Sequence, residues 1–175
     1  PAGATVVPKG APNGIAATPS AGHTFANWTV ASGSATIANA GAASTTAAIT
    51  APATVQANFT ANVVTIVTSS DSVSVPEGGT ATFQVKLSAE PAAGITVAVA
   101  RSSGDSDIAV AGGASLSFTT ANWNTGRTVT LSAAQDAAAA EGAVTITCSG
   151  TGFASVNVAA TEAEDDTTLT VVAGT

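Results

Sequence analysis

Apolar and polar residues alternate strictly along several short runs of this chain. In the run TATFQVKLS, apolar side chains occupy every second position, at Ala81, Phe83, Val85 and Leu87. Successive side chains of a β-strand point to opposite faces of a sheet, so this alternation predicts strands with one buried and one solvated face. The same alternation recurs in ITVAVA, ASLSF, RTVTLS and ASVNVA. With VVTIVT and DSVSV before them, these runs predict an antiparallel sandwich of about seven or eight short strands.

The charged residues divide the chain into two parts. Residues 1–60 contain no Asp or Glu, whereas all 11 acidic residues lie between Asp71 and Asp166 and produce the net charge of −7. The strand pattern also changes at FTANVVTIVT, where short runs separated by turn residues give way to cleaner alternation. We therefore predict an all-β fold of two modules, a small β-rich module over residues 1–61 and a β-sandwich over residues 62–166.

The composition favours a secreted, strand-rich surface protein. Charged residues make up only 9% of the chain, and Ala, Thr, Ser, Val and Gly dominate. No stretch approaches the roughly 20 consecutive apolar residues of a membrane helix, so we expect no membrane insertion. An acidic module also speaks against nucleic-acid binding, for which a basic surface is needed. We expect an extracellular or cell-surface location.

Few residues could form a catalytic centre. His23, the single histidine, lies in the turn AGHTF of a module without acidic residues, so neither a Ser-His-Asp triad nor a zinc site can be assembled there. Asp105 and Asp107 are adjacent loop acids without an aromatic cleft, which is poor support for a glycosidase pair. The single cysteine, Cys148, has the strand parity of Val144 and is expected to be a buried small side chain. We therefore expect no enzymatic activity.

The second module resembles the Calx-beta family. The resemblance rests on SVSVPEGGTATFQVKLS, SSGDSD, SLSFTTANWNTGRTVTLSAAQD and ATEAEDD, which in this order cover about residues 63–166. It implies a seven- to eight-stranded antiparallel, Ig-like sandwich with a calcium site at one pole. The ligands that it implies are loop carboxylates: Glu77, Asp107, Asp136, Glu141, Asp165 and Asp166.

Calcium binding is one of two interpretations of these acids. Calcium takes about six to eight oxygen ligands, which several carboxylates from separate loops can supply. Four alanines, however, separate Asp136 from Glu141 where the family has an acid-rich loop, and this puts at least one ligand in doubt. The alternative is a solvated acidic rim without an ion. No cofactor other than calcium is expected.

The first module resembles the divergent internalin B-repeat family, which occurs in tandem on bacterial surface proteins. The resemblance rests on ATPSAGHTFANWTVASGSATI, with its A-x-P-x-x-G-x-x-F-x-x-W pattern, and on APATVQANFT. It implies that Phe25 and Trp28 lie in a small core behind the turn from Pro19 to Gly22.

The end of the chain looks like the start of that same family. Family members usually begin with an apolar strand of the form T-L-T-V-x-x-G, which residues 1–60 lack and TTLTVVAGT supplies. We predict that residues 167–175 complete the first module of the next repeat or subunit. The predicted assembly strand consists of Thr168, Leu169, Thr170, Val171 and Val172. A covalent tandem array and strand addition to the open sheet edge of another copy would both give this head-to-tail contact.

The predicted function is therefore a structural one. We expect a non-enzymatic repeat unit of an extracellular bacterial surface fibre, filament or adhesin stalk, whose partners are copies of itself and a host or polysaccharide surface. The alternative is an accessory carbohydrate-binding or spacer module of a secreted polysaccharide-degrading enzyme. That alternative needs an exposed aromatic platform, for which Trp123 in TANWNTG is the candidate.

Overall fold

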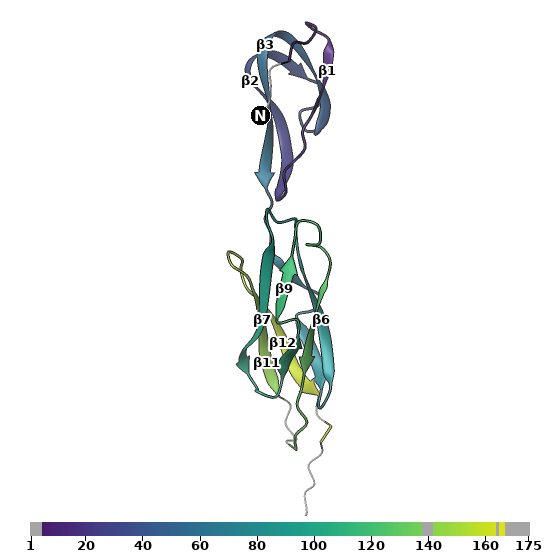
Figure 1. Ribbon diagram of the computed structural model, residues 1–175, viewed down its shortest axis with the longest axis vertical. Coiled ribbons are helices and arrows are strands. Elements are labelled where there is room, and N and C mark those ends of the chain that lie inside the picture. Colours follow the sequence, from purple (N-terminus) through teal and green to yellow (C-terminus); the bar gives the residue numbers. More distant parts are fainter. Residues whose placement is uncertain (1–4, 138–141, 164, 167–175) are drawn as a thin grey trace, which may run out of the picture. The chain divides into compact units, whose positions relative to one another are not determined.

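The computed structural model describes residues 5–137, 142–163 and 165–166. Strands are the only regular secondary structure among them, so the all-β class is confirmed, and no helix in this part is long and apolar enough to cross a membrane. The chain divides into two compact units, Pro1–Asn62 and Val63–Thr175 (Figure 1). The division lies one residue from the position expected from the sequence.

The first unit is a three-stranded antiparallel sheet in which the last strand is central, with the order β1-β3-β2. Its strands are β1 (Pro12–Ala16), β2 (His23–Ile37) and β3 (Ser44–Ala61). The edge strand β1 pairs only with Ser44–Ala48 of β3, whereas β2 pairs along Ala47–Ala61. Beyond Ala48, therefore, β3 has a strand neighbour on one side only in the described part of the unit.

The small core of the first unit is built around Trp28. This side chain is 8% exposed, and its indole Nε1 donates a hydrogen bond of 3.0 Å to the carbonyl oxygen of Ala42. The ring of Phe25 lies 5.7 Å from the ring of Trp28 and 6.0 Å from that of Phe59, between centroids. Both aromatic residues of the F-x-x-W pattern thus have structural roles, as the resemblance implied.

The second unit is built from two sheets and contains nine described strands. The four-stranded sheet has the order β4 (Ile66–Thr68), β6 (Thr80–Leu87), β10 (Arg127–Ser132), β8 (Ala109–Gly112). The five-stranded sheet has the order β5 (Ser72–Pro76), β12 (Val156–Ala163), β11 (Ala143–Ser149), β7 (Ile95–Gly104), β9 (Ser115–Phe118).

Two details of this sandwich differ from the expected antiparallel fold of seven or eight strands. The strand β8 was not predicted, because AVAG is too short and its one larger side chain, Val110, too isolated to show an alternation. The strands β5 and β12 pair in parallel. The chain changes from one sheet to the other between β4 and β5, so these two consecutive strands do not form a hairpin and β5 lies beside β12 instead. The other described strand pairs of the unit are antiparallel.

The alternating apolar residues form the core between these sheets. Phe83, Val85 and Leu87 of β6 are each at most 2% exposed. Cys148 on β11 is also fully buried, and burial raises the pKa of its thiol to about 11. The expected small, unreactive side chain is therefore what this cysteine provides.

The strand directions bring several loops to one end of the sandwich. Because β5 and β12 are parallel, and β11 is antiparallel to both β12 and β7, the strands β5, β7 and β12 all end at the same edge. In the other sheet β6 starts there and its antiparallel partner β10 ends there. Backbone hydrogen bonds join these loops, from Ala133 N to Gly79 O (3.2 Å) and from Ala134 N to Asp107 O (3.1 Å).

Gly104 turns the chain from β7 into the acidic loop at this end. Its φ is +95°, and a Cβ at this position would lie 2.2 Å from the carbonyl oxygen of Ala143. We expect Gly104→Ala to lower the free energy of unfolding by about 2 kcal/mol or more, since a side chain adds a clash to the unfavourable φ.

Gly152 offers a matched control for this substitution. Its φ is +84°, but nothing lies within 4 Å of a Cβ built there. Gly152→Ala should therefore cost only about 1 kcal/mol, from the backbone conformation alone. Urea unfolding of both variants measures the difference, and equal losses would contradict a steric role for Gly104.

Candidate metal centre

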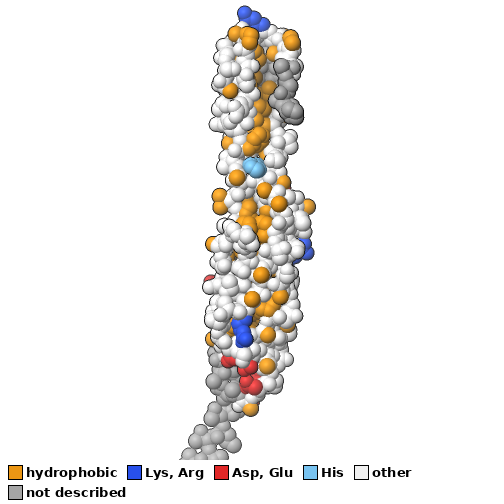
Figure 2. Space-filling view, turned by 60° about the vertical axis from the view of Figure 1, so that its left-hand side comes forward, with side chains coloured by type: hydrophobic (Ala, Val, Ile, Leu, Met, Phe, Trp, Pro, Cys, Tyr) orange, Lys and Arg blue, Asp and Glu red, His pale blue; other side chains and the backbone are white. Residues whose placement is uncertain are grey.

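Most of the described acidic side chains of the second unit gather where β5, β7, β10 and β12 end (Figure 2). Each of these strands contributes at its end or in the loop that follows it. The described acids at this end are Glu77, Asp105, Asp107, Asp136, Glu162, Asp165 and Asp166.

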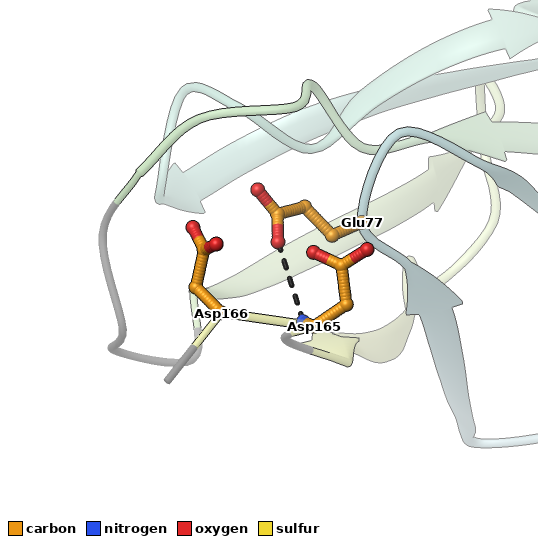
Figure 3. Close-up of side chains that lie close together, drawn as sticks. All are labelled: Glu77, Asp165 and Asp166. Atoms are coloured by element: carbon orange, nitrogen blue, oxygen red, sulfur yellow. Dashed lines mark hydrogen bonds between the residues drawn. The ribbon is translucent and has the colours of Figure 1, made fainter. Parts of the chain in front are cut away.

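Three of these carboxylates form a compact group (Figure 3). One oxygen each of Glu77, Asp165 and Asp166 can be chosen so that all three lie within 4.8 Å of one another. Asp166 Oδ2 is buried without a hydrogen-bond partner in the described structure. Such an orphaned oxygen beside two other carboxylates has the chemistry of a site for a hard cation such as calcium. The donors present fit that ion.

Backbone and amide groups hold Glu77 in place. Glu77 follows the inward-facing Val75 by two residues and is itself 8% exposed, so its side chain closes the end of the core. Its Oε1 accepts hydrogen bonds from Asp136 N (2.7 Å) and from Gln135 Nε2 (2.9 Å), and its Oε2 accepts one from Asp165 N (3.3 Å). Glu77 therefore links the loops that follow β10 and β12 to the end of β5.

The pKa of Asp165 is shifted by Glu77 and Gln135. Hydrogen bonds with the side chains of Glu77 and Gln135 lower the pKa of the Asp165 carboxyl below its usual value. The contact from Gln135 Nε2 to Asp165 Oδ1 is 3.2 Å long. At neutral pH this carboxylate is therefore charged and suited to bind a cation.

A second group of acids lies in the loop after β7. The backbone N–H of Asp107 donates a hydrogen bond of 3.0 Å to Asp105 Oδ1, and Arg101 donates one to the backbone carbonyl of Asp105. The charge of Asp105 raises the pKa of Asp107, followed by burial and by the charge of Asp136. Like charges are thus held close together in this loop.

Glu162 is the site residue that the sequence interpretation missed. It lies on β12 and is only 4% exposed, and its Oε1 has no hydrogen-bond partner among the described residues. Burial raises the pKa of Glu162, and the neighbouring carboxylates, of which Asp136 acts most strongly, raise it further. The signal was present in the strand parity, because Glu162 continues the buried row of Val158 and Ala160.

The remaining predicted site residues divide into two cases. Trp123 is half-buried and packs against the hydrophobic core, and its carbonyl oxygen accepts a hydrogen bond of 2.8 Å from Leu87 N. It therefore offers little of the aromatic platform that carbohydrate binding would need. Glu141 and the assembly strand Thr168, Leu169, Thr170, Val171 and Val172 lie outside the described residues.

Comparison with known proteins identifies the class of the first unit. The family model of the divergent InlB B-repeat domain matches residues 2–63, which confirms the resemblance of this module. Such domains are typical of bacterial surface proteins, so the match indicates a surface repeat module and hints at a location on the cell surface. A repeat module of this kind also points to a non-catalytic role.

The family match does not extend over the second unit. No curated protein matches the chain at a significant level. The resemblance of residues 63–166 to the Calx-beta family has no support from these comparisons and stays a prediction.

The raised pKa values predict how pH affects stability without divalent ions. A carboxyl whose pKa is higher in the folded state stabilises that state fully below its unfolded pKa and loses this contribution as the pH rises through the folded value. For Asp107 and Glu162 the loss begins near their ordinary values of 3.8 and 4.5. The lowered pKa of Asp165 has the opposite effect on stability. Its charged carboxylate stabilises the folded state at neutral pH, and this contribution is lost when the pH falls through the pKa of Asp165 in the folded state.

We therefore expect the melting temperature of the second unit in EDTA to fall as the pH is raised from about 4 towards 7. Glu162→Gln should flatten this fall, because the substituted side chain cannot ionise. Circular dichroism melts across this pH range measure both effects. The same slope in the two proteins would show that Glu162 does not contribute.

Proposed function

We propose that this chain is a structural repeat unit of an extracellular bacterial surface fibre or stalk, in which successive units contact one another head to tail. The single observation that carries the proposal is an open sheet edge in the unit that matches a surface repeat family. An open edge presents unpaired backbone N–H and C=O groups, which are a template for an added strand.

The open edge begins where β1 ends. Past Ala48, the side of β3 that faces away from β2 has no strand partner in the described structure, and a single backbone bond, from Gly10 N to Ile49 O (2.8 Å), follows there. A groove of about 620 Å³ opens beside Ile49–Ala53 and the segment Thr5–Lys9. Pro52 offers no backbone donor, so an added strand would pair best with the residues after it.

The sequence at the end of the chain suits this edge. In TTLTVVAGT, Leu169 and Val171 alternate with threonines, and on β3 the half-buried Val55 and Ala57 alternate with the exposed Thr54 and Gln56. A strand with this alternation would extend the apolar face of the sheet. The proposal is the same whether the strand comes from the next repeat of one chain or from a separate copy.

A synthetic peptide with the sequence of residues 167–175 tests the acceptor edge. Added in excess, it should raise the melting temperature of the first unit, because a ligand that binds only the folded state stabilises it by RT ln(1 + [L]/Kd). It should also shift the amide NMR signals of Ala53–Ala61.

Two altered peptides provide the controls for this experiment. Replacing Leu169 and Val171 by Asp should abolish the effect, whereas replacing Thr168 and Thr170 by Asp should largely preserve it, because the alternation would direct these two positions away from the apolar face of the sheet. If the natural peptide changes neither the melting temperature nor the spectrum, β3 is not the acceptor.

We further propose that the acidic end of the second unit binds calcium. Support comes from the oxygens of Glu77, Asp165 and Asp166, which lie within 4.8 Å of one another, and from the buried, unpartnered Asp166 Oδ2. Glu77 follows β5 and the two aspartates follow β12, so an ion held by them would join two strand ends and stiffen the unit. Calcium supplies the charge that offsets their mutual repulsion.

Calcium should raise the melting temperature of the second unit by several degrees relative to EDTA. A calcium concentration of about 100 times Kd would stabilise the unit by roughly 2.7 kcal/mol. Asp165→Asn should lose most of this gain.

Asp71→Asn is the matched control, since Asp71 is an exposed acid that precedes β5, whereas Glu77 follows it. Differential scanning calorimetry of the three proteins measures the gain. A melting temperature of the unaltered chain that does not respond to calcium would refute calcium binding.

A further inference from the structure

The strands β5 and β12 connect the beginning of the second unit to its end. The strand β5 is the second strand of the unit, and β12 is the last strand in its described part. They pair in parallel along Ser72–Pro76 and Ala159–Ala163. Backbone bonds continue the pairing at both ends, from Ala159 N to Asp71 O (2.9 Å) and from Glu77 N to Ala163 O (3.0 Å).

Tension along the chain would pull these two strands from opposite ends. The chain enters the sandwich through β4, which begins beside the end of β6, because Ile66 pairs with Leu87. Since β6 starts at the acidic end, the chain enters at the other end of the unit. The strand β12 runs towards the acidic end, where the chain leaves the sandwich. Force would therefore draw β5 towards the entry and β12 towards the exit, and the two strands would have to slide along each other.

Sliding two paired strands along each other strains all of their backbone bonds together. Unzipping the same pair would break these bonds one after another, at a lower force for each step. Forced unfolding is governed by the barrier to unfolding, which rises when several bonds must break at once. The strand β4 comes under tension first, but it pairs with β6 over three residues only, Ile66–Thr68. The longer pairing of β5 with β12 is therefore the stronger of the two.

Buried side chains lie beside the bonds of this pair. Val75 on β5 and Val158 and Ala160 on β12 are fully or almost fully buried. Water competes for the backbone groups of an exposed pair, whereas hydrogen bonds beside a dry core are electrostatically stronger. Past the strands, Glu77 Oε2 accepts a hydrogen bond of 3.3 Å from Asp165 N, which ties the residues that follow β5 to those that follow β12.

We propose that the parallel pair of β5 and β12 is a mechanical clamp, which keeps the second unit folded while the chain carries tension. The inference rests on the fibre role proposed above, because a fibre or stalk transmits tension from one unit to the next. It concerns a different part of the molecule from the open edge of β3, and it needs no bound ion. An antiparallel pair would be pulled from neighbouring ends and would unzip.

Single-molecule pulling of the full chain in two directions tests the clamp. Handles attached at Val63→Cys and after Thr175 stretch the second unit from its entry to its exit and make β5 and β12 slide. Handles attached at Val63→Cys and Thr151→Cys pull on the entry and on the turn before β12, which lie at the same end of the sandwich, and unzip the pair. Val63 and Thr151 are exposed, whereas the native Cys148 is buried and does not compete for the handles.

The experiment is done in EDTA, so that its result does not depend on calcium. Entry-to-exit pulling should need a several-fold higher force than unzipping. Release of about 100 residues in one step, roughly 35 nm of chain, identifies the second unit in this direction. Equal forces in the two directions would overturn the clamp. The peptide experiment on β3 is separate, since its failure would refute the acceptor edge and would not change the force that the second unit withstands.

Discussion

The parallel pairing of β5 with β12 is the constraint on which the acidic end depends. It sets Val75 beside Glu162 and Pro76 beside Ala163, so that the residues following both strands leave the sheet at the same edge. An antiparallel pairing would send Glu77 and Asp165 to opposite ends of the sandwich. The hydrogen bond from Glu77 N to Ala163 O, 3.0 Å long, extends this pairing one step beyond the strands.

The clustered carboxylates at this end repel one another, and this repulsion destabilises the folded unit. The core of the unit, however, is well packed. Leu87, Val129, Leu131, Ile146 and Val158 are all fully buried, and each such side chain stabilises the fold by roughly 1.5–3 kcal/mol. A core of this size can tolerate a cluster of like charges at its end. Repulsion by Asp105 is the main cause of the raised pKa of Asp107, whereas burial comes first for Glu162 and the neighbouring carboxylates add to it.

The sequence allowed the core to be predicted, but not the neighbours of each strand. Period-two alternation states which face of a strand is buried, and Phe83, Val85 and Leu87 are buried as expected. Alternation does not state which strands pair, and hence the parallel contact of β5 with β12 was missed. Glu162 was missed for another reason: its parity placed it inside, but an acid at an inward position is normally assumed to be solvated.

The first unit has a small apolar core. Its fully or nearly buried apolar side chains among the described residues are Trp28 and Ala47, a core too small to hold a sheet firmly. Past Ala48, moreover, the described sheet consists of β2 and β3 alone, and two-stranded ribbons are marginally stable in water. Repeat modules can gain stability from contacts with their neighbours. An added strand on β3 would bury the half-exposed Phe59 and pair the free backbone in one step, and the open edge is therefore a reason for the unit to associate with another.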